Sequence, residues 1–222
     1  MEIQTENVLY FICGANGSGK STLVENLFGK KPIITFVNAD NIAHDAKCSP
    51  KSTNVGRGVC NTIDNALSHH ESFIYETTLS AKFDGRLIER VKAAGYSIEF
   101  FYVTVSKPDD NVKRVAARKD NGGHNVRLDD ILRRRKKSLY NLGTVLGQVH
   151  NWHLYDNTED GAPHKLIAEG CTQKSGGQQV TIIKPELYSL FEQNRNEAVA
   201  AYLDDERARI ARLAAAQKIQ SK

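Results

Sequence analysis

The sequence is poor in the features that mark membrane, secreted or metal-built proteins. None of its apolar runs approaches the roughly 18 residues that a bilayer-spanning helix needs, so we expect no membrane contact. The first six residues are acidic, whereas a secretory signal begins with basic residues and an apolar run. The four cysteines show no C-x-x-C spacing, which argues against a disulfide scaffold or a zinc site. We therefore expect a cytoplasmic protein, in which Cys13, inside an apolar run, is a buried free thiol.

An excess of charge of one sign is also missing. The net charge is +4 over 222 residues, and 40% hydrophobic with 25% charged residues is typical of a globular domain. The basic residues gather between Lys107 and Lys137. A nucleic-acid surface would add aromatic residues to that charge, but the run at 133–137 has none and aspartates dilute the region. The pattern favours a lid that clamps phosphates over a nucleic-acid partner.

The feature that is present is a glycine-rich phosphate-binding motif. It lies between an apolar run at 8–13 and a helix-like segment at 23–28, and it reads Gly14-Ala15-Asn16-Gly17-Ser18-Gly19-Lys20-Ser21-Thr22. The spacing G-x-x-x-x-G-K-[ST] between a strand and a helix lets backbone N–H groups surround a phosphate chain. We expect this P-loop to bind ATP, with Lys20 at the β- and γ-phosphates and Ser21 as a ligand of Mg²⁺. The alternative is a glycine-rich turn that binds nothing.

Strand-like and helix-like segments alternate along the first half of the chain. This alternation predicts an α/β fold, with a mostly parallel sheet flanked by helices. Besides the strand at 8–13, strands are expected at 33–37, 72–75, 97–105, 149–157 and 180–183. Helices are expected at 41–46, 57–67, 83–94, 108–119 and 128–142.

The elements group into a kinase domain and a tail. We expect the P-loop domain at 1–184, with an arginine-rich lid at about 107–142. From Pro185 the sequence is helical to its end, with an intermittent apolar stripe. This C-terminal extension at 185–222 is expected to pack on the core or to bind a partner.

Polar side chains stand at the ends of two further predicted strands. Asp40 follows the strand at 33–37, and Glu76-Thr77-Thr78 follows the strand at 72–75. The carboxyl ends of parallel strands meet at one edge of a sheet, where ligands bind. Asp40 could accept the proton of an attacking hydroxyl, or it could merely cap the helix that follows. Glu76 could hold Mg²⁺ through water and the threonines could orient a substrate, or all three could satisfy a local turn.

Arginines surround a polar hinge in the middle of the lid. Arg114 and Arg118 are four residues apart and share a face of one helix. The hinge Gly122-Gly123-His124 follows, and Arg127 and Arg134 come after it. A mobile arginine lid would neutralise the charge that develops on a transferring phosphoryl group and would exclude water. The alternative is a solvated charged face.

In this order the blocks resemble the zeta-toxin kinases, most of all their compact bacterial members, over about residues 8–158. Beyond the P-loop, the matching blocks are Asn38-Ala39-Asp40-Asn41-Ile42-Ala43, Glu76-Thr77-Thr78-Leu79-Ser80, Arg114-Val115-Ala116-Ala117-Arg118, Gly122-Gly123-His124, Arg133-Arg134 with Ser138-Leu139, and Asp156-Asn157-Thr158. Apart from the P-loop each block is weak alone, and it is their common order that makes the resemblance specific.

The resemblance implies a P-loop kinase that moves the γ-phosphate of ATP to a hydroxyl of a UDP-activated amino sugar. UDP-N-acetylglucosamine is the substrate associated with the family. The resemblance also implies that Asp40 is the base on that hydroxyl and that Thr78 contacts the substrate; Glu76, Thr77 and Arg127 are further candidate contacts. The groups implied to stabilise the transferring phosphoryl are Lys20, Arg114, Arg118 and Arg134. Such toxins poison the supply of cell-wall precursors and are often held in check by an antitoxin, which is a candidate partner here.

Two other functions fit the same P-loop. One is a kinase of a different small metabolite. The other is an ATPase or nucleotide switch that acts on a protein or nucleic acid.

Overall fold

The computed structural model describes residues 7–45, 52–81, 83–120, 126–172 and 177–220. Within them a seven-stranded sheet has the order β2-β3-β1-β4-β5-β6-β7. Its strands are β1 (Val8–Cys13), β2 (Thr35–Asn38), β3 (Phe73–Thr77), β4 (Ser97–Thr104), β5 (Asn151–Asp156), β6 (Lys165–Thr172) and β7 (Gln178–Ile182). The first five strands of this order run parallel, and β6 and β7 extend the sheet antiparallel. The expected mostly parallel α/β fold is confirmed.

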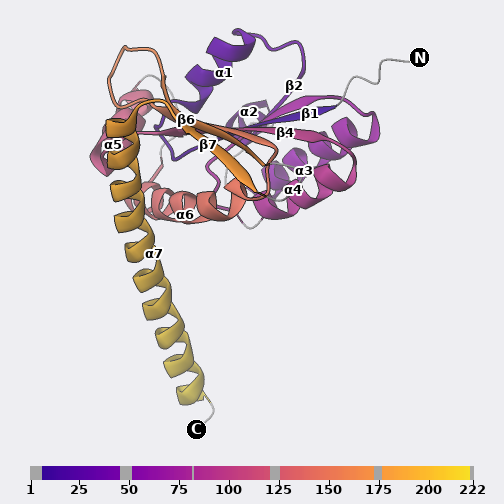
Figure 1. Ribbon diagram of the computed structural model, residues 1–222. Coiled ribbons are helices and arrows are strands. Elements are labelled where there is room, and N and C mark those ends of the chain that lie inside the picture. Colours follow the sequence, from indigo (N-terminus) through magenta and orange to yellow (C-terminus); the bar gives the residue numbers. More distant parts are fainter. Residues whose placement is uncertain (1–6, 46–51, 82, 121–125, 173–176, 221–222) are drawn as a thin grey trace, which may run out of the picture.

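Helices cover both faces of this sheet (Figure 1). They are α1 (Lys20–Phe28), α2 (Ala39–Asp45), α3 (Thr53–Ser68), α4 (Phe83–Ala93), α5 (Pro108–Asp120), α6 (Leu128–Leu146) and α7 (Pro185–Gln220). In Figure 1, α1 lies above the sheet, whereas α3, α4 and α6 lie below it.

Two hydrophobic clusters hold these layers together. The larger one joins the sheet to α3, α4, α6 and the start of α7, and Phe11 and Phe100 are fully buried in it. The smaller one packs α1 on the other face, with Leu23 against Ile12. Alternate residues of β1 therefore enter different clusters, which explains why this strand reads as a continuous apolar run. Cys13 ends β1 as the expected buried free thiol, and burial raises the pKa of that thiol.

The structure corrects several element boundaries. β3 continues to Thr77, so Glu76 and Thr77 lie within the strand rather than after it. β2 begins at Thr35 instead of Ile33, whose side chain is fully exposed. The sequence pattern does not predict β6 at all, because its apolar centre is only three residues long and polar residues flank it. β6 forms because β5 and β7 pair with it on both sides.

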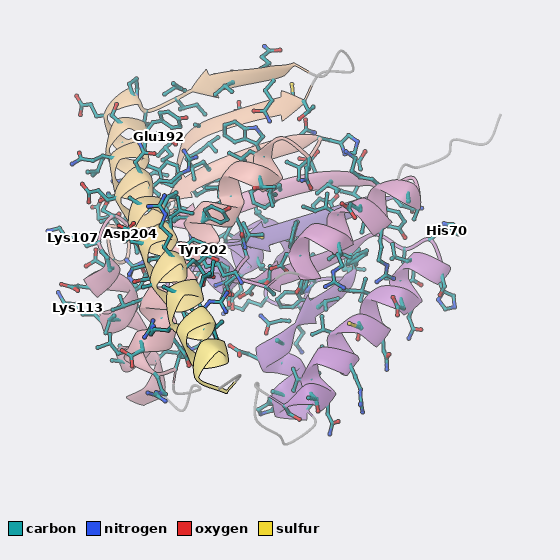
Figure 2. All side chains as sticks on the ribbon, turned by 90° about the horizontal axis from the view of Figure 1, so that it is seen from below. His70, Lys107, Lys113, Glu192, Tyr202 and Asp204 are labelled. Carbon is teal, nitrogen blue, oxygen red and sulfur yellow. The ribbon has the colours of Figure 1, made fainter. Side chains whose placement is uncertain are left out.

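The C-terminal helix α7 is anchored at its start and exposed further on. Phe191 and Ala198 are buried in the larger cluster. Tyr202 packs on Tyr140 of α6 with ring centroids 4.8 Å apart, and Lys136 of α6 bonds Asp205 at 2.8 Å. Beyond that point α7 projects away from the sheet (Figure 1), and Figure 2 shows Glu192, Tyr202 and Asp204 placed along it. Among the described helices, none is both long and apolar enough to cross a membrane.

Candidate active site

A cleft of about 1310 Å³ opens at the carboxyl edge of the parallel strands. The P-loop, the ends of β2 and β3, helices α5 and α6, and the loop between β5 and β6 line it. The expected site residues that it contains are Asn16, Gly17, Gly19, Lys20, Ser21, Thr22, Asp40, Glu76, Thr77, Thr78, Arg114, Arg118 and Arg134. Gly14, Ala15, Ser18 and Arg127 are not among its lining residues. The P-loop and Asp40 thus face a common space.

The P-loop turns so tightly that three of its positions, Gly14, Gly17 and Gly19, admit only glycine, and the last two line the cleft. Gly19 has a φ of +98°, and a Cβ atom there would lie 2.1 Å from Nδ2 of Asn157. Gly17 has a φ of +74°, and a Cβ atom there would lie 2.6 Å from the carbonyl oxygen of Asn111. A side chain at either position would be strained and would collide with neighbouring atoms. The backbone can therefore approach a phosphate chain closely at the start of α1.

Lys20 is the buried cation of the P-loop. Its Nζ donates a hydrogen bond to the Ala15 carbonyl at 3.1 Å, and its side chain is 8% exposed. Burial lowers the pKa of Lys20, while the charge of Glu76 opposes that shift. A buried ammonium group gains most from a nearby anion, which a phosphate would supply.

Ser21 and Glu76 meet beside the cradle. The Ser21 hydroxyl donates to Oε2 of Glu76 at 3.0 Å, with Oε1 at 3.2 Å. A hydroxyl and a carboxylate are the hard oxygen ligands that Mg²⁺ prefers. Their contact joins the first turn of α1 to the end of β3, so the residues present fit a Mg²⁺ ion at the phosphate end of the cleft.

The Asp40 carboxylate does not cap α2, because another residue does. Oδ1 of Asn38 accepts hydrogen bonds from the backbone N–H groups of Asp40 at 2.7 Å and Asn41 at 3.2 Å. Asp40 itself lies in the first turn of α2, so the interpretation of Asp40 as the N-cap is wrong. Its carboxylate instead accepts a hydrogen bond from Nη2 of Arg118 at 3.2 Å. Both side chains are nearly half exposed, so this ion pair adds little stability.

The expected lid arginines divide into three inside the cleft and one outside it. Arg114 bonds the Thr158 carbonyl at 3.2 Å and forms an ion pair with Asp160. Arg134 reaches Oδ1 of Asn16 on the P-loop at 3.5 Å. The side chain of Arg127 is 77% exposed and lies 3.6 Å from the Asp129 carboxylate. The expected hinge Gly122-Gly123-His124 lies outside the described residues.

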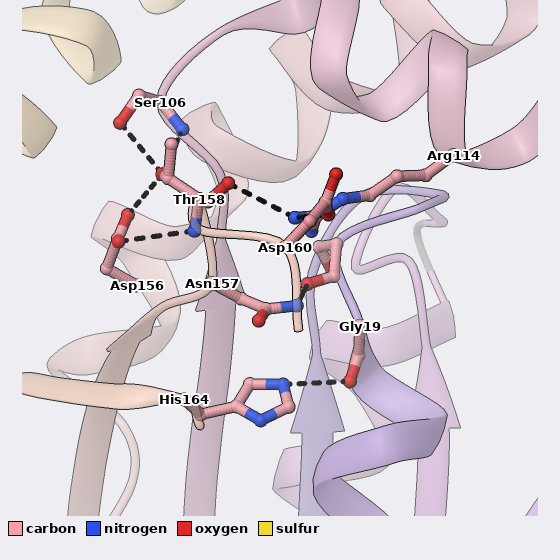
Figure 3. Close-up of polar contacts among 9 residues, drawn as sticks. Gly19, Ser106, Arg114, Asp156, Asn157, Thr158, Asp160 and His164 are labelled. Carbon is pink, nitrogen blue, oxygen red and sulfur yellow. Dashed lines mark hydrogen bonds and ion pairs between the residues drawn. The ribbon is translucent and has the colours of Figure 1, made fainter. Parts of the chain in front are cut away.

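The loop between β5 and β6 closes one side of the cleft, and sequence reasoning identified only its start (Figure 3). Nδ2 of Asn157 donates to the Ser18 carbonyl at 2.9 Å. His164 contacts the Gly19 carbonyl through Nε2 at 3.1 Å; because a carbonyl only accepts, this nitrogen carries the hydrogen. Burial lowers the pKa of His164, which favours the neutral form of its ring. Nothing in the local sequence signals a contact across so many residues.

The turn after β3 presents two hydroxyl groups to the cleft. Thr78 and Ser80 both line it, and their hydroxyl oxygens are 2.8 Å apart. Leu79, between them, has a φ of +55° and is completely buried. A left-handed backbone costs a leucine about 1–2 kcal/mol, whereas burying its side chain contributes about 1.5–3 kcal/mol. Burial therefore offsets the strain and holds the turn in this shape.

Asp84, at the start of α4, ties the same turn to β3. Its carboxyl group accepts hydrogen bonds from the Tyr75 hydroxyl and from the Ala81 N–H, both at 3.3 Å. The residue is 1% exposed, and burial raises the pKa of its carboxyl to about 6. A carboxyl beneath the cleft thus changes charge near neutral pH.

Comparison of the sequence with protein families and curated proteins gives two matches. A family model described as an AAA domain matches residues 9–140. An uncharacterised protein of Haemophilus influenzae is 31% identical over 136 residues, which is 59% of this chain and 93% of that protein.

The fold is also similar to solved structures at low sequence identity. The AvrRxo1-ORF1:-ORF2 crystal structure with ATP has a TM-score of 0.65 and 16% identity and matches 84% of this chain. This chain spans only 63% of the AvrRxo1 chain. The structure from the PezAT chromosomal toxin-antitoxin system of Streptococcus pneumoniae has a TM-score of 0.55 and 14% identity, covering 89% of this chain and 88% of that one. At such identities the likeness concerns the fold.

Proposed function

Since the chain belongs to the AAA-domain family and has a P-loop kinase-like fold, we propose that it is a zeta-type kinase. It transfers the γ-phosphate of ATP to a hydroxyl of a UDP-activated amino sugar such as UDP-N-acetylglucosamine. The observation that carries this proposal is the shared cleft, in which the Asp40 carboxylate faces the same space as Lys20 and the P-loop. The sugar nucleotide itself rests on the resemblance of the motifs to the zeta-toxin kinases.

The transfer needs a base for the acceptor and a cradle for ATP. Asp40 takes the proton of the acceptor hydroxyl while the oxygen of that hydroxyl forms a bond to the γ-phosphorus. The bond between that phosphorus and the β,γ-bridging oxygen breaks, and ADP leaves with the electron pair. Arg118 holds the Asp40 carboxylate in place at 3.2 Å until the acceptor binds.

Positive charge at the phosphate end stabilises the transferring group. Lys20 lies in the P-loop, Arg134 contacts Asn16 of the P-loop, and Arg114 lies at the wall of the same cleft. These fixed cations act where negative charge builds up on the equatorial oxygens. Ser21 and Glu76 would hold Mg²⁺, which when bound withdraws charge from the β- and γ-phosphates.

An antitoxin is the protein partner that this proposal includes. The support is the shared fold with a structure from the PezAT toxin-antitoxin system. A zeta-type toxin would act in the cytoplasm, where ATP and nucleotide sugars are found.

The test is a transfer assay with labelled ATP, Mg²⁺ and a panel of UDP-sugars. Asp40→Asn should lower transfer by about 10²–10⁴-fold while leaving the dissociation constant for ATP within about twofold. Asp45→Asn is the matched control, because Asp45 lies on the same helix with a side chain that is 83% exposed. Near-normal turnover by Asp40→Asn would remove Asp40 as the base. If a different metabolite carried the label, that metabolite would replace the UDP-amino sugar as the assigned acceptor. Label found only in free phosphate would favour an ATPase.

A further inference from the structure

The turn at Thr78, Leu79 and Ser80 is a constrained part of the cleft wall. Its central residue, Leu79, adopts a left-handed conformation that leucine rarely takes. The side chain of Leu79 points into the core that β3 shares with α4 and α6. Because the backbone reverses at this buried residue, its two neighbours both reach the cleft. Their hydroxyl groups are thereby brought to 2.8 Å from each other.

Three hydrogen bonds from three elements fix this turn. Nδ2 of Asn141, on α6, donates to the Leu79 carbonyl at 2.9 Å. The Ala81 N–H donates to Asp84 of α4 at 3.3 Å, and Asp84 in turn accepts from Tyr75 of β3 at 3.3 Å. The hydroxyl pair therefore has a fixed place relative to β3, α4 and α6.

Helix α6 connects this turn to the phosphate end of the cleft. Asn141 and Arg134 are seven residues apart, so they lie on one face of the helix, two turns from each other. Arg134 contacts Asn16 of the P-loop, and Asn141 contacts the turn. A single rigid element thus sets the separation between the two ends of the cleft.

The chemistry of the pair indicates what it binds. Each hydroxyl can donate one hydrogen bond and accept others, so the pair suits two neighbouring hydroxyl groups on a ligand. Ala81 is the next described residue that lines the cleft after Ser80, and it is uncharged. The arginines that line the cleft have other partners: Arg118 pairs with Asp40, Arg114 with Asp160, and Arg134 contacts Asn16 of the P-loop. These groups favour a neutral, hydroxyl-bearing ring over a phosphate or carboxylate.

We propose that Thr78 and Ser80 form a two-hydroxyl clamp that holds neighbouring hydroxyl groups of a neutral sugar ring, and that Leu79 and Asn141 are its positioning residues. Thr78 was expected as a substrate contact from the family resemblance, whereas Ser80, Leu79 and Asn141 were not. The clamp rests on the proposed function, because that function makes a sugar nucleotide the acceptor of the phosphate. The clamp adds which part of the acceptor the protein holds, namely the ring hydroxyl groups, and which residues hold it.

The first test separates the KM values for acceptor and ATP, with UDP-N-acetylglucosamine as the probe. Ser80→Ala and Thr78→Val should each raise the acceptor KM by about tenfold and leave the ATP KM within about twofold. Ser68→Ala is the control, because Ser68 is an exposed serine at the end of α3. An unchanged acceptor KM in Ser80→Ala would overturn the clamp.

The positioning residues need a readout that a loss of stability would not produce. Asn141→Asp removes the donor at nearly constant size, and Asn65→Asp on α3 is its matched exposed control. At a temperature where the variant is fully folded, Asn141→Asp should raise the acceptor KM by about tenfold and leave the ATP KM within about twofold. Leu79→Gly accepts the positive φ but frees the turn, so it should also raise the acceptor KM. Equal increases in the KM for the acceptor and the KM for ATP would refute a positioning role.

If the wild-type protein transferred no phosphate to UDP-amino sugars, the proposed function would be wrong, but the clamp could still be tested by binding. Calorimetry in the presence of ADP and Mg²⁺ would then compare neutral sugars with their singly deoxygenated counterparts. Binding of at least one sugar that weakens about tenfold in Ser80→Ala supports the clamp. Equal binding by wild type and variant, or no binding of any sugar in the panel, overturns it.

Discussion

Replacing Gly19 by alanine is expected to damage the P-loop and the loop across from it together. The new Cβ would stand 2.1 Å from Nδ2 of Asn157 and 3.1 Å from Nε2 of His164, at a φ of +98°. The backbone strain costs about 1–2 kcal/mol for a residue with a side chain. Displacing Asn157 also removes its bond to the Ser18 carbonyl, for a further 0.5–1.5 kcal/mol or so. The free energy of unfolding should therefore fall by about 1.5–3.5 kcal/mol.

The measurement is urea denaturation of Gly19→Ala, Asn157→Ala and the double variant. Asn157→Ala alone should cost about 1 kcal/mol, because it loses the same hydrogen bond without a collision. In the double variant the collision is gone and the lost bond is counted once, so the cost should be clearly less than the sum of the two single costs. Additive losses would show that Gly19 and Asn157 do not interact. A Gly19→Ala protein as stable as wild type would refute the whole steric argument.

Three further outcomes follow from the structure. Burial raises the pKa of Asp84 to about 6, so on unfolding this carboxyl releases its proton more readily and stability should fall by about 2 kcal/mol as pH rises from 4 to 7. Asp84→Asn should remove that slope in denaturant titrations. Ser21→Ala should raise the Mg²⁺ concentration needed for half-maximal ATP turnover, and an unchanged Mg²⁺ dependence would exclude Ser21 as a ligand. Phe191→Ala should lower the free energy of unfolding by about 3–5 kcal/mol, because Phe191 is buried. Deleting residues 206–222 should lower it by less than about 1 kcal/mol, because the described side chains there are largely exposed. Equal losses would contradict the assigned packing of α7.

The parts of the site that sequence reasoning located depend on short-range rules. The P-loop is a local motif, and its strand and helix are where the spacing places them. Asp40 reaches the same cleft because parallel strands end at one edge of a sheet, which holds for any such topology. These features needed no knowledge of side-chain packing.

The parts that were missed depend on packing between distant segments. His164 meets Gly19 only because β6 turns back along β5, and β6 itself has a weak pattern. The left-handed turn at Leu79 is set by the core around its side chain, since leucine has no local preference for it. Asn and Asp are both favoured helix caps, so the sequence alone could not show that Asn38 caps α2 and that the Asp40 carboxylate meets Arg118 instead.

The length of α7 has a consequence for how a protein bound to this chain could cover the cleft. At about 1.5 Å per residue its 36 residues extend roughly 54 Å, and the far end stands away from the domain in Figure 1. A protein that bound only this free end would leave the cleft open to solvent. To cover the cleft, that protein would need a second segment long enough to extend back from the end of α7 to the domain.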